Sequence, residues 1–432
     1  MNKPSAIAPL VRTALLAALF AAAFSLPAWG QSYAITNAHI HPVSGPDIER
    51  GTVLVVDGKI AQLGRRLRVP GGARRIDGRG KHVYPGLFNS DTNIGLTEIG
   101  AVAVSNDSSE MGAYSPQLLA WTAIHVESEH IPVARVDGIT HVVTRPSGGT
   151  IAGQGAAVHL DGWTQEEMEI DRRAALYLNL PSLLSTRSSP FGGRFGSRNR
   201  TYKTAKKEFD EKVVELKELF ARVRHYAESR SEDAVPNRRL EALMAAVKGE
   251  QPVVIPANSH ADIKNAVEFA QGEGLNYLIL GASDAWMITD FLKENDVRVI
   301  LGPRQVLPNR NDDPIDIIYQ TPRILQEKGV RFALATGGSA NARTLPFEVG
   351  NAVAHGLSAH DALRSITLTP AEFFGIDDRL GSIEEGKIAN LLVTDGDIFE
   401  YQSKIHHVFI QGKDIPLDSK HSKLYEKYIA RP

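Results

Sequence analysis

Short apolar runs alternate with helical stretches through the middle of the chain, and this alternation constrains the fold most. The runs ITHVVT, PVVIPA, LNYLILGA, VRVILGP and VRFALAT are each followed by a segment with helical spacing. Repeated units of this kind build an α/β fold with a parallel sheet or barrel. Because no Gly-x-Gly-x-x-Gly fingerprint follows the first strand, the pattern favours a closed (β/α)8 TIM-like barrel over a dinucleotide-binding sheet.

One predicted helix has an apolar face that is expected to pack against the rest of the protein. Its apolar residues recur at steps of three and four, which places them on one face of an otherwise charged helix. These residues are Phe209, Val213, Leu216, Phe220 and Val223.

Both ends of the chain have the pattern of short β-strands. Between residues 33 and 83, Asp57-Gly58 separates two apolar stretches as in a hairpin. The segments RLGSIEEGKIANLLVTDGDIF and HHVFIQGKDIPL repeat that pattern near the other end. We expect the two ends to form one sheet, a small composite β-sandwich, with the barrel inserted between them.

The first 30 residues are typical of a secretory signal peptide. Lys3 and Arg12 precede an apolar run from about Ala14 to Phe24, and small residues stand at Ala28 and Gly30. The run is shorter than the roughly 20 residues needed to cross a bilayer, which favours cleavage near Gly30 over a membrane anchor. We therefore expect export to the periplasm.

Composition narrows the ligand class. The chain has no cysteine, so no disulfide stabilises it in an oxidising compartment. Its 48 basic and 50 acidic residues nearly balance, which gives no global field toward nucleic acid or an anionic membrane. No later segment is apolar enough for a stable membrane span. We expect a small-molecule amide or peptide-like ligand.

These patterns divide the chain into a signal peptide (1–30), an N-terminal part of the β-sandwich (31–84), a barrel (85–375) and a C-terminal part of the sandwich (376–432). The Gly-, Ser- and Arg-rich stretch at about 185–205 is predicted to be a mobile loop within the barrel. Its arginines either close over an anionic substrate or belong to an ordinary solvated loop. They are Arg187, Arg194, Arg198 and Arg200.

Three ordered segments carry motifs of a known family. PGLFNSDTNIGLTEIG begins at Pro85, and ITLTPAEFFGIDDRL is followed by GSIEEGKIANLLV. Together with the β unit around Asp57-Gly58, they resemble the amidohydrolase superfamily, especially its imidazolonepropionase-related branch, over nearly all of the mature chain. The resemblance implies hydrolysis of an amide or cyclic C–N bond other than a peptide bond, by metal-activated water.

The first barrel strand of that family carries His-x-His, and here the two positions hold Asp91 and Asn93. Alternate side chains of a strand share a face, so both positions point into the barrel mouth. Asp91 and Asn93 offer oxygen atoms that suit a hard cation weakly, but the nitrogen pair that favours zinc is gone. Both remain candidate catalytic residues.

The later metal positions of the family have also changed. The family places histidines after two further strands, and an aspartate that ligates metal and acts as general base after the last strand. At these positions the chain has Pro256 or Asn258, then Gly281 and Ala282, then Gly337 and Gly338. No lysine stands where it would bridge metals as a carbamate. The metal-ligand positions are therefore degenerate.

Histidines elsewhere are candidates for substitute ligands. His141, His260 and His355 fall near the expected barrel mouth, and Asp91, His141 and His260 are the weak candidates for a rebuilt metal site. Zinc needs three or four convergent ligands, and a lone histidine is more often packed or capped. His260 is expected in the first turn of a helix capped by Ser259. No cofactor is expected unless the site is rebuilt for zinc or manganese.

Arg145 follows the run ITHVVT at the end of a predicted barrel strand, where barrel active sites are built. Its guanidinium suits a carboxylate or carbonyl oxygen of a ligand, which makes it the third candidate catalytic residue. The alternative is a structural salt bridge to Asp91 or Glu98.

Two hypotheses of function remain. The first is a hydrolase with an unusual site centred on Asp91 and Asn93, working with metal or with Asp91 as a base of raised pKa. The second is a pseudoenzyme that binds a ligand, either as a homo-oligomer or as the partner subunit of an active paralogue. The degenerate ligand positions favour the second, because a fold does not by itself carry a function.

Overall fold

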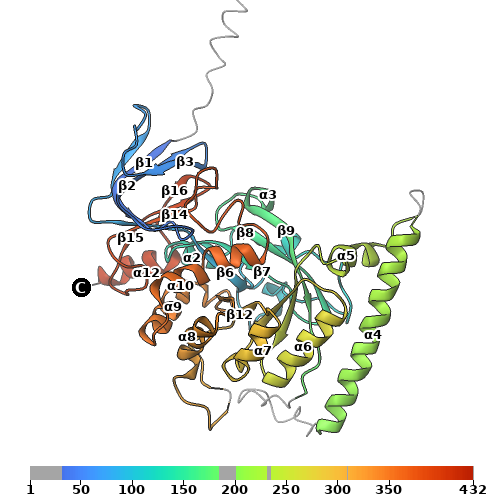
Figure 1. Ribbon diagram of the computed structural model, residues 1–432. Helices are drawn as coiled ribbons and strands as arrows, with labels where there is room; N and C mark the ends of the chain where they lie inside the picture. Colours follow the sequence, from blue (N-terminus) through green and yellow to red (C-terminus); the bar gives the residue numbers. More distant parts are fainter. Residues whose placement is uncertain (1–31, 184–200, 231–234, 309, 432) are drawn as a thin grey trace, which may run out of the picture.

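The computed structural model describes residues 32–183, 201–230, 235–308 and 310–431. Within them lie two eight-stranded sheets, one built from both chain ends and one from the middle of the chain (Figure 1). The predicted signal peptide (1–30) lies outside the described residues. So do the four arginines of the predicted loop, Arg187, Arg194, Arg198 and Arg200.

The first sheet joins the two ends of the chain, as predicted. Its strand order is β16-β15-β14-β5-β1-β2-β3, with β4 also paired to β1. The strands are β1 (Tyr33–Ile40), β2 (Ile48–Val56), β3 (Lys59–Gly64), β4 (Arg74–Asp77), β5 (His82–Pro85), β14 (Leu391–Thr394), β15 (Ile405–Ile410) and β16 (Lys413–Ile415). The N-terminal and C-terminal strands meet where β5 pairs antiparallel with β14.

Local chemistry explains the turn at one edge of this sheet. Asp57 and Gly58 connect β2 to β3 with φ angles of 49° and 79°, the conformation of a tight hairpin turn. A Cβ atom on Gly58 would stand 2.9 Å from the carbonyl oxygen of Gln411, so glycine also permits a close approach of the two chain ends. In the core of the sheet, Tyr33 packs edge-on against Phe409 with ring centroids 5.1 Å apart.

The second sheet is a nearly closed barrel of order β13-β12-β11-β10-β9-β8-β7-β6. Its strands are β6 (Leu87–Thr92), β7 (Ile139–Thr144), β8 (Ile151–His159), β9 (Glu169–Leu178), β10 (Val253–Ala257), β11 (Tyr277–Gly281), β12 (Val299–Leu301) and β13 (Phe332–Leu334). The first and last strands approach where Asn89 Nδ2 donates to Thr336 Oγ1 (2.7 Å) and the Gly337 amide donates to the Asp91 carbonyl (3.0 Å).

The barrel departs in one respect from the predicted repetition of βα units. Strand β8 runs antiparallel to both β7 and β9. The segment 145–150 between β7 and β8 holds no helix, and only the one-turn helix α3 (Gln165–Met168) begins between β8 and β9. A parallel neighbour needs a crossover of a dozen or more residues, whereas short connections of this kind join antiparallel strands.

Helices cover the outside of the barrel, and α4 (Tyr202–Ser229) runs along one side (Figure 1). Of its predicted stripe, Phe209, Leu216, Phe220 and Val223 are buried and Val213 packs half-buried against the core. The others are α2 (His130–Arg135), α5 (Arg238–Val247), α6 (His260–Gly272), α7 (Thr289–Glu294), α8 (Ile317–Lys328), α9 (Leu345–Ala354), α10 (Ala359–Ser365), α11 (Leu368–Phe373) and α12 (Lys420–Ile429). None of the described helices has the length and apolarity to cross a membrane.

Gly86, which precedes β6, shows why the Pro-Gly-Leu motif carries a glycine. A Cβ atom at this position would lie 2.1 Å from Oγ1 and 2.5 Å from Cγ2 of Thr140, a residue with no exposed surface. The backbone of β6 and the side chain of Thr140 on β7 therefore approach more closely than any larger residue would allow.

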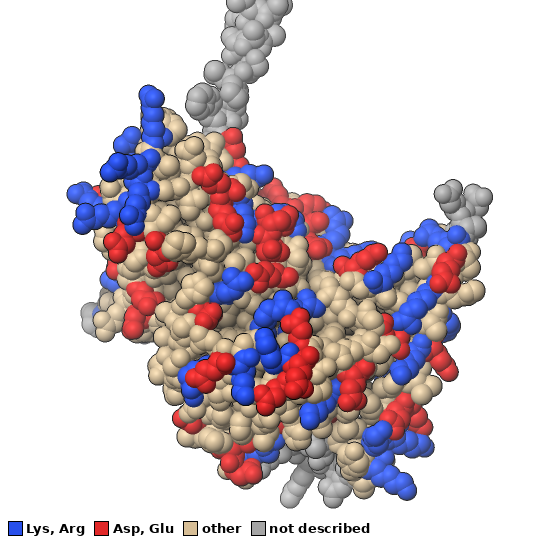
Figure 2. Space-filling view, viewed as in Figure 1, with Lys and Arg blue, Asp and Glu red and all other residues tan. Residues whose placement is uncertain are grey.

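Charges of both signs are mixed over much of the face drawn in Figure 2, in keeping with the net charge of −2. Basic side chains gather over the part of the surface that strands β1 to β3 form (Figure 2). Exposed arginines follow β3 and begin β4, namely Arg65, Arg66, Arg68, Arg74 and Arg75.

Candidate functional site

A cavity of about 1150 Å³ opens at the carboxyl ends of the barrel strands. Active sites of barrel enzymes lie at this end, because the loops that follow the strands converge there. Charged residues of both signs line it: Asp91, Arg145, Asp262, Asp284, Arg304, Arg310, Asp312 and Asp313. Two of the three predicted catalytic candidates, Asp91 and Arg145, are among them.

Asp91 and Arg145 form an ion pair inside this cavity. Asp91 is the penultimate residue of β6, with 3% of its surface exposed, and Arg145 Nε donates a hydrogen bond to its Oδ1. The guanidinium also lies over the ring of Tyr177, 5.8 Å from its centroid. Burial by itself lowers the pKa of Arg145, but the charge of Asp91 and the hydrogen bond to it together raise that pKa. Of the two partners expected for a salt bridge, Arg145 uses Asp91.

Asn93 is engaged in structural hydrogen bonds. Its Nδ2 donates to Thr97 Oγ1 (3.0 Å), and its Oδ1 accepts from the backbone amide of Ser339 (2.7 Å). These bonds tie the segment after β6 to the segment after β13. Asn93 is not among the residues that line the cavity.

The glycines at the family's metal positions lie around Asp91, as the resemblance implies. A Cβ atom on Gly337 would stand 3.8 Å from Asp91 Oδ2, and one on Gly281 would stand 2.4 Å from Asn258 Oδ1. The positions therefore converge, but two of them offer no side chain, and the one carboxylate is already bound to Arg145. These donors do not fit a zinc or manganese ion, which needs several nitrogen or carboxylate ligands at one point.

His141 is buried inside the barrel, away from the cavity lining. Its ring stacks on Phe88 at 4.4 Å, its Nδ1 shares a hydrogen bond with Thr140 Oγ1 (2.8 Å), and its Nε2 has no hydrogen-bond partner among the described residues. His159 stands directly opposite it on β8. Burial lowers the pKa of His141 well below its usual value, and the neighbouring His159 lowers it further.

The other two candidate histidines are held elsewhere. His260 begins α6 with Ser259 as its cap, as predicted, and its side chain is 48% exposed with Nδ1 3.3 Å from Asp284 Oδ2. His355 ends α9, where its ring stacks on Tyr319 at 5.1 Å. Asp91, His141 and His260, the weak candidates for a rebuilt metal site, do not come together as a metal-binding group among the described residues.

Sequence reasoning missed a second ion pair in the cavity. Asp284 is 2% exposed and accepts two hydrogen bonds from Arg310, from Nη1 to Oδ2 (2.9 Å) and from Nη2 to Oδ1 (3.2 Å). Arg310 Nε donates in turn to Asp313 Oδ1 (2.9 Å). The sequence could have indicated Asp284, because this residue follows β11 at the carboxyl end of the barrel, where active sites are built. Arg310 belongs to a loop, and the pattern of strands in the sequence does not predict where a loop residue lies.

Arg304 is a further charged cavity residue that the sequence analysis did not single out. It is 4% exposed, and its guanidinium donates to the backbone carbonyls of Gly302 (2.8 Å) and Ile318 (3.1 Å). No carboxylate of the described chain lies within salt-bridge distance of it. Burial lowers the pKa of Arg304 to about 10, and the charge of Glu348 offsets part of that effect. Arg304 therefore stays cationic at neutral pH and brings positive charge to the cavity wall.

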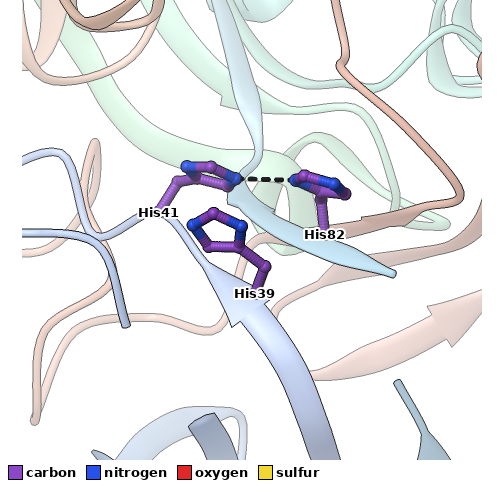
Figure 3. Close-up of side chains that lie close together, drawn as sticks. All are labelled: His39, His41 and His82. Atoms are coloured by element: carbon purple, nitrogen blue, oxygen red, sulfur yellow. Dashed lines mark hydrogen bonds between the residues drawn. The ribbon is translucent and has the colours of Figure 1, made fainter. Parts of the chain in front are cut away.

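Outside the barrel, three histidines of the first sheet lie together (Figure 3). His39, His41 and His82 each offer a ring nitrogen, and these nitrogens lie within 4.8 Å of one another. This is the single group of three or more histidine, cysteine or acidic side chains that could hold a metal ion in the part of the chain that the structure describes. Sequence analysis missed it, although His39-x-His41 stands on a predicted strand.

Comparisons with known proteins agree with the motifs. The family model described as "Amidohydrolase family" matches residues 291–415. An imidazolonepropionase of Syntrophobacter fumaroxidans (strain DSM 10017 / MPOB) is 40% identical over 82 residues, which are 18% of this chain and 19% of that protein. The matched part thus spans about a fifth of the curated relative.

Solved structures extend the likeness to most of the fold. An amidohydrolase from Thermotoga maritima MSB8 superposes with a TM-score of 0.76 at 24% identity, covering 89% of this chain and 99% of that one. A prolidase in complex with N-methylphosphonate-L-proline gives a TM-score of 0.54 at 17% identity, covering 89% of this chain and 99% of its own. The family model and the imidazolonepropionase each match a part of the chain, and the solved structures show that the chain shares the fold of these amidohydrolases.

Proposed function

We propose that this protein binds a small amide or peptide-like ligand with a carboxylate group at the barrel mouth, without the metal-dependent hydrolysis of its family. The ion pair between Asp91 and Arg145 carries the proposal. A metal ion at this place would supply positive charge beside Asp91, and Arg145 supplies that charge instead. Gly281 and Gly337 add no ligand atom. The likeness to amidohydrolases favours a ligand with a C–N bond of the kind that these enzymes hydrolyse.

Arg304 supports a carboxylate as the ligand's polar group. The buried guanidinium donates to neutral carbonyls and has no carboxylate of the described residues within salt-bridge distance, so a carboxylate of the ligand is the partner that it would bind most strongly. Arg145 and Arg310 already neutralise Asp91 and Asp284 in the same cavity. The prolidase in the comparison was solved with a proline derivative, a ligand that also carries a carboxylate.

Replacing Arg304 by methionine is expected to weaken binding of N-acetyl amino acids or dipeptides by about 10- to 100-fold, because one charge-assisted hydrogen bond contributes roughly 1.5–3 kcal/mol. Isothermal titration calorimetry with an acid and its matched primary amide measures the effect. Arg364→Met is the control, since Arg364 pairs with Glu372 and does not line the cavity. Equal affinity for acid and amide in the unchanged protein would contradict the carboxylate assignment.

Hydrolysis is the second candidate, and the position of Asp91 at the barrel mouth favours it over other reactions. The same dipeptides and N-acyl amino acids are incubated with the protein, with and without zinc or manganese, and product is followed by mass spectrometry. We expect binding without turnover. Turnover that needs added metal and disappears in Asp91→Asn would sink the non-catalytic proposal. Turnover without metal, lost in Asp91→Asn, would assign Asp91 as the base.

The remaining parts of the proposal concern location and assembly. We propose export through residues 1–30 and a periplasmic protein with a (β/α)8-type barrel (85–375) and a composite β-sandwich (31–84 with 376–432), acting alone, as a homo-oligomer or beside an active paralogue. Expression of the full chain in a bacterium with a general secretory pathway is expected to yield a mature N-terminus close to Gly30. Intact-mass measurement of the periplasmic fraction tests this, and an uncleaved chain in the cytoplasm would refute it.

A further inference from the structure

We propose that His39, His41 and His82 bind one divalent transition metal ion of the zinc type, at a site in the composite sheet that is separate from the barrel cavity. It does not depend on the function proposed above.

Strand geometry brings the three histidines together. His39 is the penultimate residue of β1, and His41 stands two positions later, just past Ile40. Alternate residues of an extended strand point to the same side, so the two rings lie on one side of the sheet. Strand β5 runs parallel to β1, with His82 in direct register with His39. The rings are stacked in consequence, with centroids 4.4 Å apart for His39 and His41, 5.0 Å for His39 and His82, and 5.2 Å for His41 and His82.

The nitrogens face one another (Figure 3). His41 Nε2 lies 2.9 Å from His82 Nδ1, and one nitrogen of His39 completes a group whose members are all within 4.8 Å. Ligand nitrogens about 2.0–2.1 Å from a tetrahedral zinc ion lie roughly 3.3 Å from one another. Small rotations of half-buried rings would convert the present spacing to that of a metal site.

Asp47 completes the arrangement as the carboxylate behind the ligands. Its Oδ2 lies 2.7 Å from His41 Nδ1 and 3.3 Å from His39 Nε2. When His41 Nδ1 donates a hydrogen bond to Asp47, the lone pair of His41 is on Nε2, directed toward His82, which is how a carboxylate orients a metal-binding imidazole. The carboxylate of Asp47 thus makes the surroundings of the triad favourable for a cation.

One ring nitrogen of the cluster lacks a hydrogen-bond partner among the described residues. The Nε2 atom of His39 is buried and makes no hydrogen bond in spite of its distance to Asp47. Neutral imidazole is the form that binds metal, and its borderline softness selects zinc, copper or nickel over magnesium and calcium.

The test uses the whole mature protein, stripped with a chelator and titrated with zinc sulfate in a calorimeter, with metal content measured by mass spectrometry after dialysis. We expect one equivalent of zinc. His41→Ala and His82→Ala are each expected to weaken binding by at least about 100-fold, and Asp47→Asn by about 10- to 100-fold as an orienting carboxylate. His406→Ala is the matched control, because His406 lies on β15 of the same sheet and pairs only with Asp395 (3.1 Å).

The outcomes separate this site from the barrel. Zinc retained in Asp91→Ala and lost in His82→Ala supports the triad, whereas zinc lost in Asp91→Ala or unaffected by His41→Ala and His82→Ala overturns it. Absence of binding tighter than about 1 mM in the unchanged protein overturns it as well. If a variant unfolds, electron paramagnetic resonance of copper bound to the unchanged protein decides, since a spectrum without coupling to several nitrogens contradicts three histidine ligands.

Discussion

Replacement of Asp91 by alanine is expected to lower the free energy of unfolding by about 3–5 kcal/mol, because it leaves the guanidinium of Arg145 without its partner beside a buried ring. The Asp91 side chain is almost fully buried, so water does not replace the lost carboxylate well. Urea denaturation at neutral pH measures the loss. The exposed pair of Lys206 and Asp210 provides the control, and Asp210→Ala is expected to cost no more than about 0.5 kcal/mol.

The double variant Asp91→Ala, Arg145→Met gives a sharper result. Removing both charges leaves no buried ion to solvate, so we expect it to be more stable than Asp91→Ala alone. If the double variant is instead less stable than the single one by the full cost of Arg145→Met, the two side chains do not interact as an ion pair.

Acidification is expected to destabilise the fold steeply below about pH 6.5, through the two histidines inside the barrel. Burial, with smaller contributions from Arg379 and Lys413, lowers the pKa of His159 to about 3, and burial lowers that of His141 in the same direction. The unfolded chain therefore binds more protons than the folded one in this window. Stability is complete above pH 6.5 and is lost as the pH falls toward 3, by about 1.4 kcal/mol per pH unit for each histidine.

Melting temperatures between pH 4 and pH 8 test this expectation. His159→Gln keeps an acceptor for the amide of Asn390, which lies 3.1 Å from His159 Nδ1, and is expected to flatten the acid limb of the profile. His406→Gln, a change at an exposed ring, should leave the limb as steep as before. A His159→Gln profile parallel to that of the unchanged protein would show that carboxylates alone govern the acid transition.

The sequence predicted the sheet that joins the two chain ends and the barrel strands β7 and β10 to β13, because these depend on local patterns. Apolar runs and Asp57-Gly58 mark strands and turns wherever they occur, and helix α4 buries the face that its spacing indicates. The direction of β8 was not predictable in this way, because alternation of side chains is the same in parallel and antiparallel strands. The contact of Asn89 with Thr336, which helps close the barrel, joins residues far apart in the chain.

Residues of the candidate site were predictable from the sequence only where they lie at the ends of strands. Asp91 lies near the end of β6 and Arg145 directly follows the neighbouring β7, so their meeting at the barrel mouth could be anticipated. His141 lies on one of the same strands but deeper, and the sequence does not say how far along a strand the cavity begins. Arg304 and Arg310 belong to irregular segments without a periodic signal. The histidine cluster required the register of β1 against β5, which a single sequence does not specify.

The pairing of β5 with β14 delays the completion of the first sheet until the end of synthesis. Val83 meets Val393 across this seam, so loop closure over about 300 residues precedes the contact. Until then β5 presents an open edge of backbone donors and acceptors, which is a template for association with another chain. A nascent or truncated chain that ends after the barrel would therefore be prone to aggregation and would depend on chaperones, even though every strand of its barrel is already made.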